Sequence, residues 1–370
     1  MKTILGSVLA MALAAEICPA SGSNLPEPDQ ARLREDLEFL CSDALDGRET
    51  GTPGAARAAA YLAGKMQEAG LTPLQAGGWG GATPFHFPWA YGEARWFFAP
   101  APAGRWPAPG RGREAWDVVG VVPGTDPALD SEYVFVTAHF DHLGSFRGAV
   151  YRGADDDASG TAALLEAMRL LRHAQPRRTL AFLGVSGEEE GLLGSEAFLA
   201  RPPIALEAIK ADINLDMVGR GRPGELHVMP ARRQGSVTTL TRDARACARA
   251  HGVALSAGME AHWQDSDHYS FARRGVASVC FNTGLHEDYH QPTDTPDKID
   301  YQALANVVRI VRDLALATAD ADQAPAVLPP KVWRAWAWGP YRTPGSEPGP
   351  AGLKKNQDPG QLPVPVEVGL

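Results

Sequence analysis

The feature that most constrains the fold is a regular alternation of short apolar runs with amphipathic segments between residues 117 and 317. The apolar runs are rich in Val, Ile and Phe and short enough for strands, whereas the segments between them repeat apolar residues at helical spacing. Strands that alternate with helices form a mostly parallel sheet covered by helices on both faces. We therefore predict an α/β fold with a doubly wound, mostly parallel central sheet. The expected strands are 117–124, 132–140, 179–186, 209–219 and 276–284, and the expected helices are 31–42, 55–69, 161–173, 191–200, 236–251 and 301–317.

Acidic and imidazole side chains fall where these predicted strands end. They are His139, Asp141, Glu188, Glu189, Asp216 and His290, together with three consecutive aspartates, Asp155 to Asp157, in a crossover loop. Functional groups of open α/β sheets gather at the carboxyl ends of the strands, so these side chains are expected to meet. Taken singly, a histidine at a strand end is usually a surface or core residue, and a glutamate run usually complements a helix dipole. Asp216 lies in an apolar run, and buried carboxylates are rare without a partner or a cation.

The side-chain types indicate which cation such a site would hold. The chain has four cysteines, Cys18, Cys41, Cys247 and Cys280, and no Cys-x-x-C pair, so a thiolate zinc site is not suggested. Cys41 and Cys280 lie in apolar runs and are expected to be buried thiols. Imidazole and carboxylate ligands without thiolates favour zinc, with manganese or cobalt as alternatives.

Six stretches carry a resemblance to a known family. They are AHFDHLG (138–144), GADDDASG (153–160), GEEEGLLGS (187–195), LDMVG (215–219), SDHYSF (266–271) and DYHQPTDTPDKI (288–299). In this order they resemble the secreted bacterial leucyl aminopeptidases, which carry two co-catalytic zinc ions. Relatives of that family include glutamate carboxypeptidases, glutaminyl cyclases and the metal-free transferrin receptor. The resemblance covers about residues 115–315, and more loosely 30–75, and implies a zinc-peptidase type of fold.

The resemblance implies a role for each matching residue. The metal ligands would be His139, Asp156, Glu189, Asp216 and His290, with Asp156 bridging two zinc ions. Glu188 would be the general base, and Asp141 would orient His139, as metal-bound imidazoles usually require. Asp155 and Asp157 are expected to bond backbone N–H groups and shape the turn. The family also keeps a cis peptide bond after the bridging aspartate.

Residues that contact the substrate are less strongly marked. Tyr289 resembles a tyrosine that in several family members hydrogen-bonds the developing oxyanion, and its alternative is a packing aromatic. Ser266 is expected to be a further polar contact near the metals. The free amine of a peptide needs an acidic group or carbonyls, for which Glu188, Glu189 and the tail end of the segment GRETGTPG (47–54) are the candidates.

Three other functions are compatible with the same fold. A glutaminyl cyclase generally uses one zinc and alters the aspartate loop, whereas GADDDASG keeps the hydrolase form. A carboxypeptidase needs basic groups for the substrate carboxylate, and Arg147, Arg152 and Arg220 are the candidates. A non-enzymatic ectodomain has lost ligands, whereas all five positions are present here. The sequence therefore predicts a metallo-exopeptidase, with aminopeptidase favoured.

The N-terminus predicts an export signal. Lys2 precedes an apolar run at residues 4–15 that is too short to span a bilayer, and small residues near Ala20 offer a cleavage site. Residues 1–20 are therefore expected to be a signal peptide, with a periplasmic or extracellular location for the mature protein. A lipoprotein cut at Cys18 and a buried N-terminal helix are the alternatives.

The rest of the chain sets the domain limits and the expected partners. A single catalytic domain is expected over residues 30–320, with an irregular excursion at 75–115 and a Pro/Gly-rich tail at 322–370. The net charge of −9 gives no electrostatic support for nucleic-acid binding. No other apolar stretch is long enough to span a membrane. The expected partner is thus a peptide substrate, and no oligomeric state is implied.

Overall fold

A computed structural model describes Cys18 and residues 25–74, 83–87, 113–221, 225–230, 237–256 and 259–328. The predicted signal peptide, apart from Cys18, lies outside the described residues, as does most of the predicted tail. No helix in the described part of the chain is both long and apolar enough to cross a membrane.

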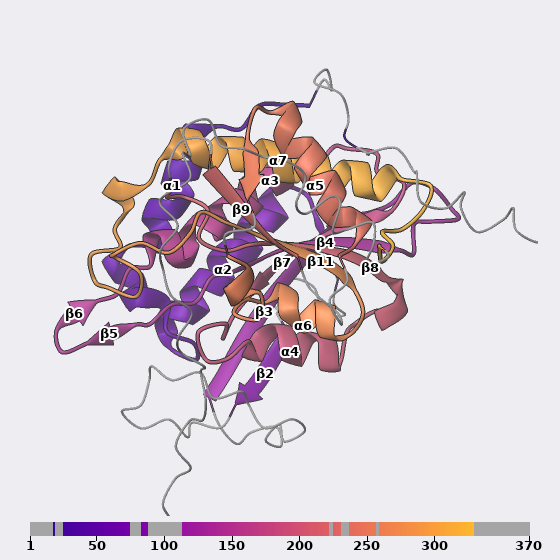
Figure 1. The fold of residues 1–370 in the computed structure, drawn as a ribbon. Coiled ribbons are helices and arrows are strands. Elements are labelled where there is room, and N and C mark those ends of the chain that lie inside the picture. Colours follow the sequence, from indigo (N-terminus) through magenta and orange to yellow (C-terminus); the bar gives the residue numbers. More distant parts are fainter. Residues whose placement is uncertain are drawn as a thin grey trace, which may run out of the picture. The chain divides into compact units, whose positions relative to one another are not determined.

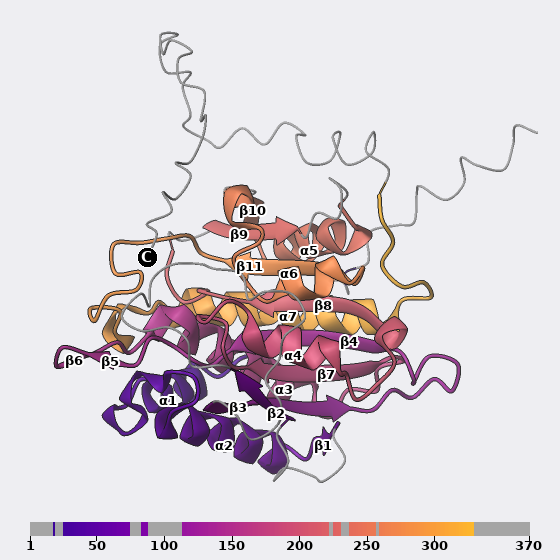
Figure 2. The ribbon, with the colours of Figure 1, turned by 90° about the horizontal axis from the view of Figure 1, so that it is seen from below.

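Nine strands form one sheet in the described residues, in the order β1-β3-β7-β4-β8-β11-β9-β10, with β2 paired to β3 beside this path. Figure 2 shows this order from β10 at the top to β1 at the bottom. The four central strands β7, β4, β8 and β11 are parallel, whereas β3 and β9 join the two sides of this group antiparallel. The mostly parallel sheet is thus confirmed at its centre. The strands are β1 (Thr72–Pro73), β2 (Thr83–Phe87), β3 (Arg113–Val122), β4 (Tyr133–His139), β7 (Thr179–Val185), β8 (Ile209–Leu215), β9 (Glu225–Pro230), β10 (Ala254–Ser256) and β11 (Ala277–Asn282).

Helices cover both faces of the sheet (Figure 1). One hydrophobic cluster joins the sheet to α1, α2, α3, α5 and α7, and a second joins the opposite face to α4 and α6. Every residue of β7 is buried, which is why this strand reads as a continuous apolar run and shows no alternation. The helices are α1 (Gln30–Leu40), α2 (Pro53–Glu68), α3 (Gly160–Leu171), α4 (Leu193–Ala200), α5 (Thr239–Ala250), α6 (His268–Arg273) and α7 (Tyr301–Asp320).

Several segments differ from the sequence expectation. The strands β1, β9 and β10 were not predicted, and neither were β2 and α6. The stretch 75–115 was expected to be irregular, but 83–87 forms β2, which pairs antiparallel with the start of β3. The prediction failed there because backbone pairing at a sheet edge needs no apolar period. The helix α6 was not predicted, since six residues are too few to show helical periodicity. At the start of the tail, the Leu328 N–H donates to the Val237 carbonyl at 2.7 Å, just before α5.

The parallel centre of the sheet determines where the predicted site residues meet. The strands β4, β7, β8 and β11 run in the same direction, so their carboxyl ends lie at one edge. His139 is the last residue of β4, and Asp216 directly follows β8. The loops after β7 and β11 also start from this edge.

Candidate metal centre

All five predicted ligands converge at the carboxyl edge of the sheet. Glu189 comes from the loop after β7 and His290 from the loop after β11, whereas Asp156 lies in the turn that leads into α3. Two groups of possible metal donors share Asp156: one with His139 and Asp216, the other with His142 and Glu189. The fifth predicted ligand, His290, lies beside the second group. The structure therefore places Asp156 between two possible cation positions.

The first group consists of His139, Asp156 and Asp216. The Nε2 atom of His139 lies 3.3 Å from Oδ1 of Asp156 and 3.9 Å from Oδ1 of Asp216. Two ligands bound to one zinc ion at about 2.1 Å in tetrahedral geometry lie about 3.4 Å apart, so these spacings suit one ion. Both ring nitrogens of His139 are buried without a hydrogen-bond partner, as expected for an imidazole whose partner is a metal.

The second group is built on the other oxygen of Asp156. The Nε2 atom of His290 lies 3.0 Å from Oδ2 of Asp156 and 3.1 Å from Oε2 of Glu189. The Nδ1 atom of His142 lies 2.7 Å from Oε1 of Glu189 and 4.0 Å from Oδ2 of Asp156. The first of these distances is that of a hydrogen bond, so His142 holds the Glu189 carboxylate with one oxygen turned toward His290. The donor set, with imidazole and carboxylate and no thiolate, fits zinc in both groups.

Burial and close charges shift the pKa values of these groups in opposite directions. Burial alone would lower the pKa of His290, but Glu189 and Asp156 outweigh it and raise that pKa to about 10. For Glu189, burial and the Asp156 charge act upward, yet the neighbouring His290 and His142 lower its pKa to about 2. Burial raises the pKa of Glu188 well above its usual range, against the effect of His139. The centre therefore contains ionised carboxylates beside one carboxyl group that holds a proton strongly.

The three aspartates have different partners, as the sequence predicted. Oδ1 of Asp157 accepts hydrogen bonds from the backbone N–H groups of Gly160 and Met217, at 2.9 and 3.0 Å. Oδ1 of Asp155 accepts from the Gly219 N–H at 2.7 Å. The peptide bond between Asp156 and Asp157 is cis. The outer two aspartates thus shape the turn, and the middle one points into the metal centre.

A glycine before the triplet is required by the same turn. Gly153 has a φ of 51°, in the left-handed region that favours glycine. A Cβ atom there would collide with the Asp156 carbonyl oxygen and with the His142 ring. Any larger residue at this position would therefore displace two members of the centre.

Asp141 acts differently from the expectation. Its Oδ1 lies 3.6 Å from Nδ1 of His139, which is longer than a hydrogen bond. Asp141 instead accepts hydrogen bonds from the Thr50 hydroxyl at 2.8 Å and from the Glu188 backbone N–H at 3.3 Å. Asp141 therefore links the segment around Thr50 to the position of Glu188, and only approaches His139.

The first half of the segment GRETGTPG is used inside the protein, whereas at its tail end Thr52 caps α2. Arg48 is completely buried and donates to four backbone carbonyls, those of Leu40, Phe140, Arg152 and Gly153. It thereby joins the end of α1 to the loop that follows His139 and to the turn that carries Asp156. Neither its guanidinium nor the Thr50 hydroxyl is available to a substrate.

A pocket of about 150 Å³ opens onto the centre. Its apolar side is made by Met229, Met259 and Leu285, and Glu188 lines its floor together with the ligands. The remaining lining residues include Met217, His262, Asp265, Asn282 and Tyr289. Such a pocket combines an apolar wall with a few convergent polar groups, as small-molecule sites do.

Of the two predicted substrate contacts, the structure brings only one to the pocket. Tyr289 lines the pocket and stacks on His290, with ring centroids 3.8 Å apart. Burial and the Asp156 charge raise the pKa of Tyr289, so its hydroxyl stays protonated and can donate. Ser266 is buried, does not line the pocket, and accepts a hydrogen bond from Nδ2 of Asn214 at 2.7 Å. The structure therefore does not place Ser266 among the described residues that line the pocket, and its contact with substrate stays a prediction.

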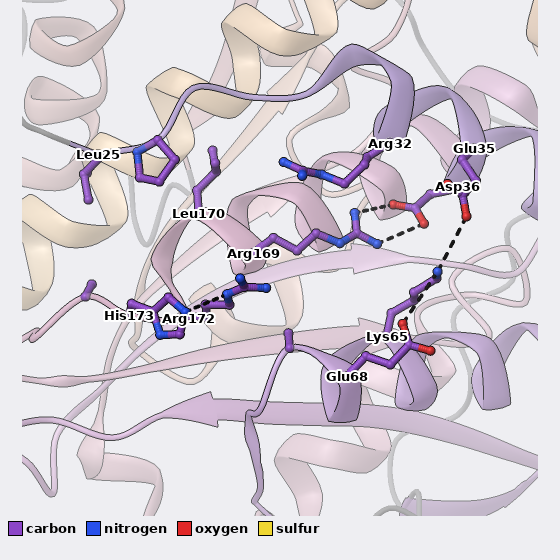
Figure 3. A pocket seen from close by; sticks show the side chains of 13 residues that line it. Leu25, Arg32, Glu35, Asp36, Lys65, Glu68, Arg169, Leu170, Arg172 and His173 are labelled. Atoms are coloured by element: carbon purple, nitrogen blue, oxygen red, sulfur yellow. Dashed lines mark hydrogen bonds and ion pairs between the residues drawn. The ribbon is translucent and has the colours of Figure 1, made fainter.

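A larger hollow of about 610 Å³ lies between α1, α2 and α3 (Figure 3). Its charged side chains pair with one another: Nη2 of Arg169 donates to Asp36 at 3.0 Å, and Lys65 lies 3.7 Å from Glu35. These groups offer no cluster of His and carboxylate donors. The pocket at the sheet edge is smaller, but it is lined by candidate metal ligands and by Glu188.

Three residues of the site were not predicted from the sequence. His142 stands in the quoted stretch AHFDHLG, so its signal was a second histidine three positions after a ligand. Asp294 accepts from the backbone N–H groups of Asp155 and Asp156, at 2.9 and 3.2 Å, and thus supports the turn from another loop. Arg48 gave no local signal, because its partners are backbone carbonyls distant in sequence.

The fold and the site together define an α/β domain with a candidate metal centre at the carboxyl edge of its sheet. Residues 117–315 match Peptidase family M28, and the chain belongs to that family. The matched region includes all five predicted ligands and both loops that Arg48 joins.

Individual relatives agree with this assignment. A probable leucine aminopeptidase of Arthroderma otae is 30% identical over 196 residues, which are 50% of this chain and 54% of the relative. The match thus spans about half the length of that curated relative. A zinc aminopeptidase from Bacillus subtilis has the same fold, with a TM-score of 0.61 at 17% identity over 81% of this chain and 97% of that one. A glutaminyl cyclase from Bacteroides thetaiotaomicron also shares it, with a TM-score of 0.57 at 18% identity, covering 80% and 99%. The fold alone therefore does not separate a peptidase from a cyclase.

Proposed function

We propose that the protein is an exported aminopeptidase that removes N-terminal residues from peptides with two zinc ions and Glu188 as general base. The observation that carries this proposal is the position of Asp156, whose two oxygens face two separate donor groups beside a pocket that Glu188 lines. Membership of Peptidase family M28 supports the peptidase class. Manganese or cobalt could replace zinc with the same ligands.

The chain's own residues provide the proton transfers. When bound, a pair of zinc ions supplies a water of lowered pKa and polarises the scissile carbonyl. Glu188 accepts a proton from the attacking water and later gives it to the leaving amine. Glu188 is buried beside the ligand Glu189 and lines the pocket, which suits it to this role. The hydrogen bond from the Glu188 backbone N–H to Asp141 fixes the position of the base.

Tyr289 and the pocket wall orient the substrate. The protonated Tyr289 hydroxyl donates to the oxygen on which negative charge develops. Met229, Met259 and Leu285 offer an apolar surface to the first side chain of the peptide. Glu188 and Glu189 are the acidic groups in reach of its free amine.

The charges around the pocket favour an aminopeptidase over a carboxypeptidase. No lysine or arginine is among the described residues that line it, whereas a substrate carboxylate needs a cation. Of the candidates for that role, Arg152 donates to the Cys41 carbonyl at 2.8 Å, and Arg220 is paired with Asp288 at 2.6 Å. These two cations are occupied within the protein, and the third candidate, Arg147, lies over the Phe146 ring and does not line the pocket.

One experiment tests the proposal. Purified protein loaded with zinc is assayed on aminoacyl-nitroanilides, the same compounds with an acetylated N-terminus, peptides with a C-terminal reporter, and a peptide with N-terminal glutamine. We expect hydrolysis of the free-amine substrates only, with two zinc ions per chain by elemental analysis. Cleavage of C-terminal residues, or cyclisation of glutamine with one zinc ion per chain, would refute the proposal. Activity in the periplasmic or culture fraction of a secreting host tests export.

A further inference from the structure

Two cysteines that are far apart in the sequence are in contact. The thiols of Cys18 and Cys247, both free in this structure, lie within hydrogen-bonding reach of each other. Cys247 is completely buried on α5, and Cys18 packs, partly buried, against the hydrophobic cluster that contains it. The other two cysteines lie elsewhere, with Cys41 beside Arg48 and Cys280 beside the Asn214 amide. Only one pairing among the four is therefore suggested by the contacts.

The chain between Cys18 and α1 is also attached to this part of the molecule. The Pro26 carbonyl accepts a hydrogen bond from Arg312 at 2.7 Å, and Glu27 pairs with Arg309, both on α7. The helices α5 and α7 pack side by side (Figure 1). The N-terminal segment thus approaches the helix pair on which Cys247 lies.

We propose that Cys18 and Cys247 form a disulfide bond in the exported protein and that this bond fastens the start of the mature chain to α5. The inference rests on the export part of the proposed function, because disulfides form and persist in oxidising compartments. It also requires that signal cleavage leaves Cys18 in place. The sequence Ala12-Leu13-Ala14 has the small-x-small pattern of a cleavage site, and a cut after Ala14 retains Cys18, unlike a cut near Ala20.

The bond forms by exchange with an external disulfide, supplied by a thiol oxidase protein in the cell or by oxidised glutathione in solution. The hydrogen bond from Cys247 lowers the pKa of Cys18, which is also the more accessible of the two thiols. The Cys18 thiolate attacks the external disulfide and releases one thiol, which leaves a mixed disulfide. Cys247 then attacks the Cys18 sulfur and releases the second thiol. The two protons and two electrons lost by the protein are carried by the two released thiols.

The test uses the full chain expressed in a secreting bacterial host. The purified protein is blocked with a thiol reagent without reduction, digested with trypsin and examined by mass spectrometry. We expect the peptide that begins at Ala15 and ends at Arg32 to be linked to Ala246–Arg249, and to separate from it on reduction. The Cys41→Ala variant is the matched control and should keep the link, whereas Cys18→Ser should lose it. Reduction should lower the midpoint of thermal unfolding of the wild type by about 5–15 °C and leave that of Cys18→Ser unchanged.

Three results would overturn the inference: a mature chain that starts after Cys18, a lipid on Cys18, or full alkylation of Cys18 and Cys247 after incubation with oxidised glutathione. A failure of the proposed function would be seen in other measurements than a failure of the disulfide. The nitroanilide assay does not measure the disulfide, and the glutathione experiment forms the bond without export.

Discussion

Replacement of Arg48 tests the claim that a single buried cation holds the metal centre together. Its Nε donates to the Phe140 carbonyl at 2.8 Å, and its Nη1 donates to the carbonyls of Leu40 and Arg152 at 2.5 and 2.7 Å. Its Nη2 donates to the Gly153 carbonyl at 3.1 Å. Phe140 lies between His139 and the other members of its loop, and Gly153 begins the aspartate turn. Removal of the guanidinium therefore frees both loops at once.

The size of the effect follows from these bonds. The Gly153 oxygen also accepts from the Ala158 N–H, so within the described residues three carbonyls lose their main partner in Arg48→Met. A buried polar group left without a partner costs about 1–3 kcal/mol, which gives roughly 3–9 kcal/mol before relaxation. Water that enters the freed space reduces the cost of the unpaired carbonyls. We therefore expect a loss of about 3–5 kcal/mol in the free energy of unfolding. Arg48→Lys keeps the positive charge but replaces the planar guanidinium by one ammonium group. This variant should lose less of the free energy of unfolding than Arg48→Met.

The assay is equilibrium unfolding in urea, followed by circular dichroism, with and without zinc. Arg201→Met is the matched control, because Arg201 is exposed on the surface after α4. We also expect weaker zinc binding by Arg48→Met, measured against a competing chelator, since the segments that carry His139 and Asp156 lose their support. A stability of Arg48→Met within about 1 kcal/mol of the Arg201→Met control would refute the reasoning.

Three further predictions concern the centre itself. Glu188→Gln should bind zinc normally by elemental analysis and lower turnover by about 10²–10⁴-fold, since only the proton acceptor is lost; a wild-type rate would rule out Glu188 as the base. His142→Ala removes the hydrogen bond to Glu189 and should weaken zinc binding about 10–100-fold in chelator competition, and unchanged affinity would contradict that role. In protein treated with a chelator, the folded-state pKa of His290 is about 10 against an ordinary 6.5, so its stabilising contribution is complete below pH 6.5 and is lost as the pH rises toward 10. Urea unfolding between pH 6 and 10 should show this decline, and His290→Gln should reduce it; an equal decline in both proteins would exclude His290 as its source.

Long, buried elements were predictable because their sequence patterns are local. The strand β7 is apolar throughout since helices cover both of its faces, and α7 shows helical periodicity over its whole length. Short elements such as β2 and α6 were not predictable. Pairing at a sheet edge, or packing of one or two helical turns, produces no periodic pattern of apolar residues. The resemblance added the ligand set, and five of its residues lie together in the structure.

By itself, the sequence determined the α/β class and the positions of the central strands, and through the resemblance it predicted five donors in the short motifs that follow them. Tertiary structure alone decided which groups support those donors. Arg48, His142 and Asp294 act through partners that are brought close only when strands and loops from across the chain meet at one edge of the sheet. It also decided that Ser266 is buried outside the pocket lining and that Asp141 lies closer to the Glu188 N–H than to His139. The physical reason is that a motif specifies donor chemistry locally, whereas a hydrogen bond depends on a distance that only the folded chain sets.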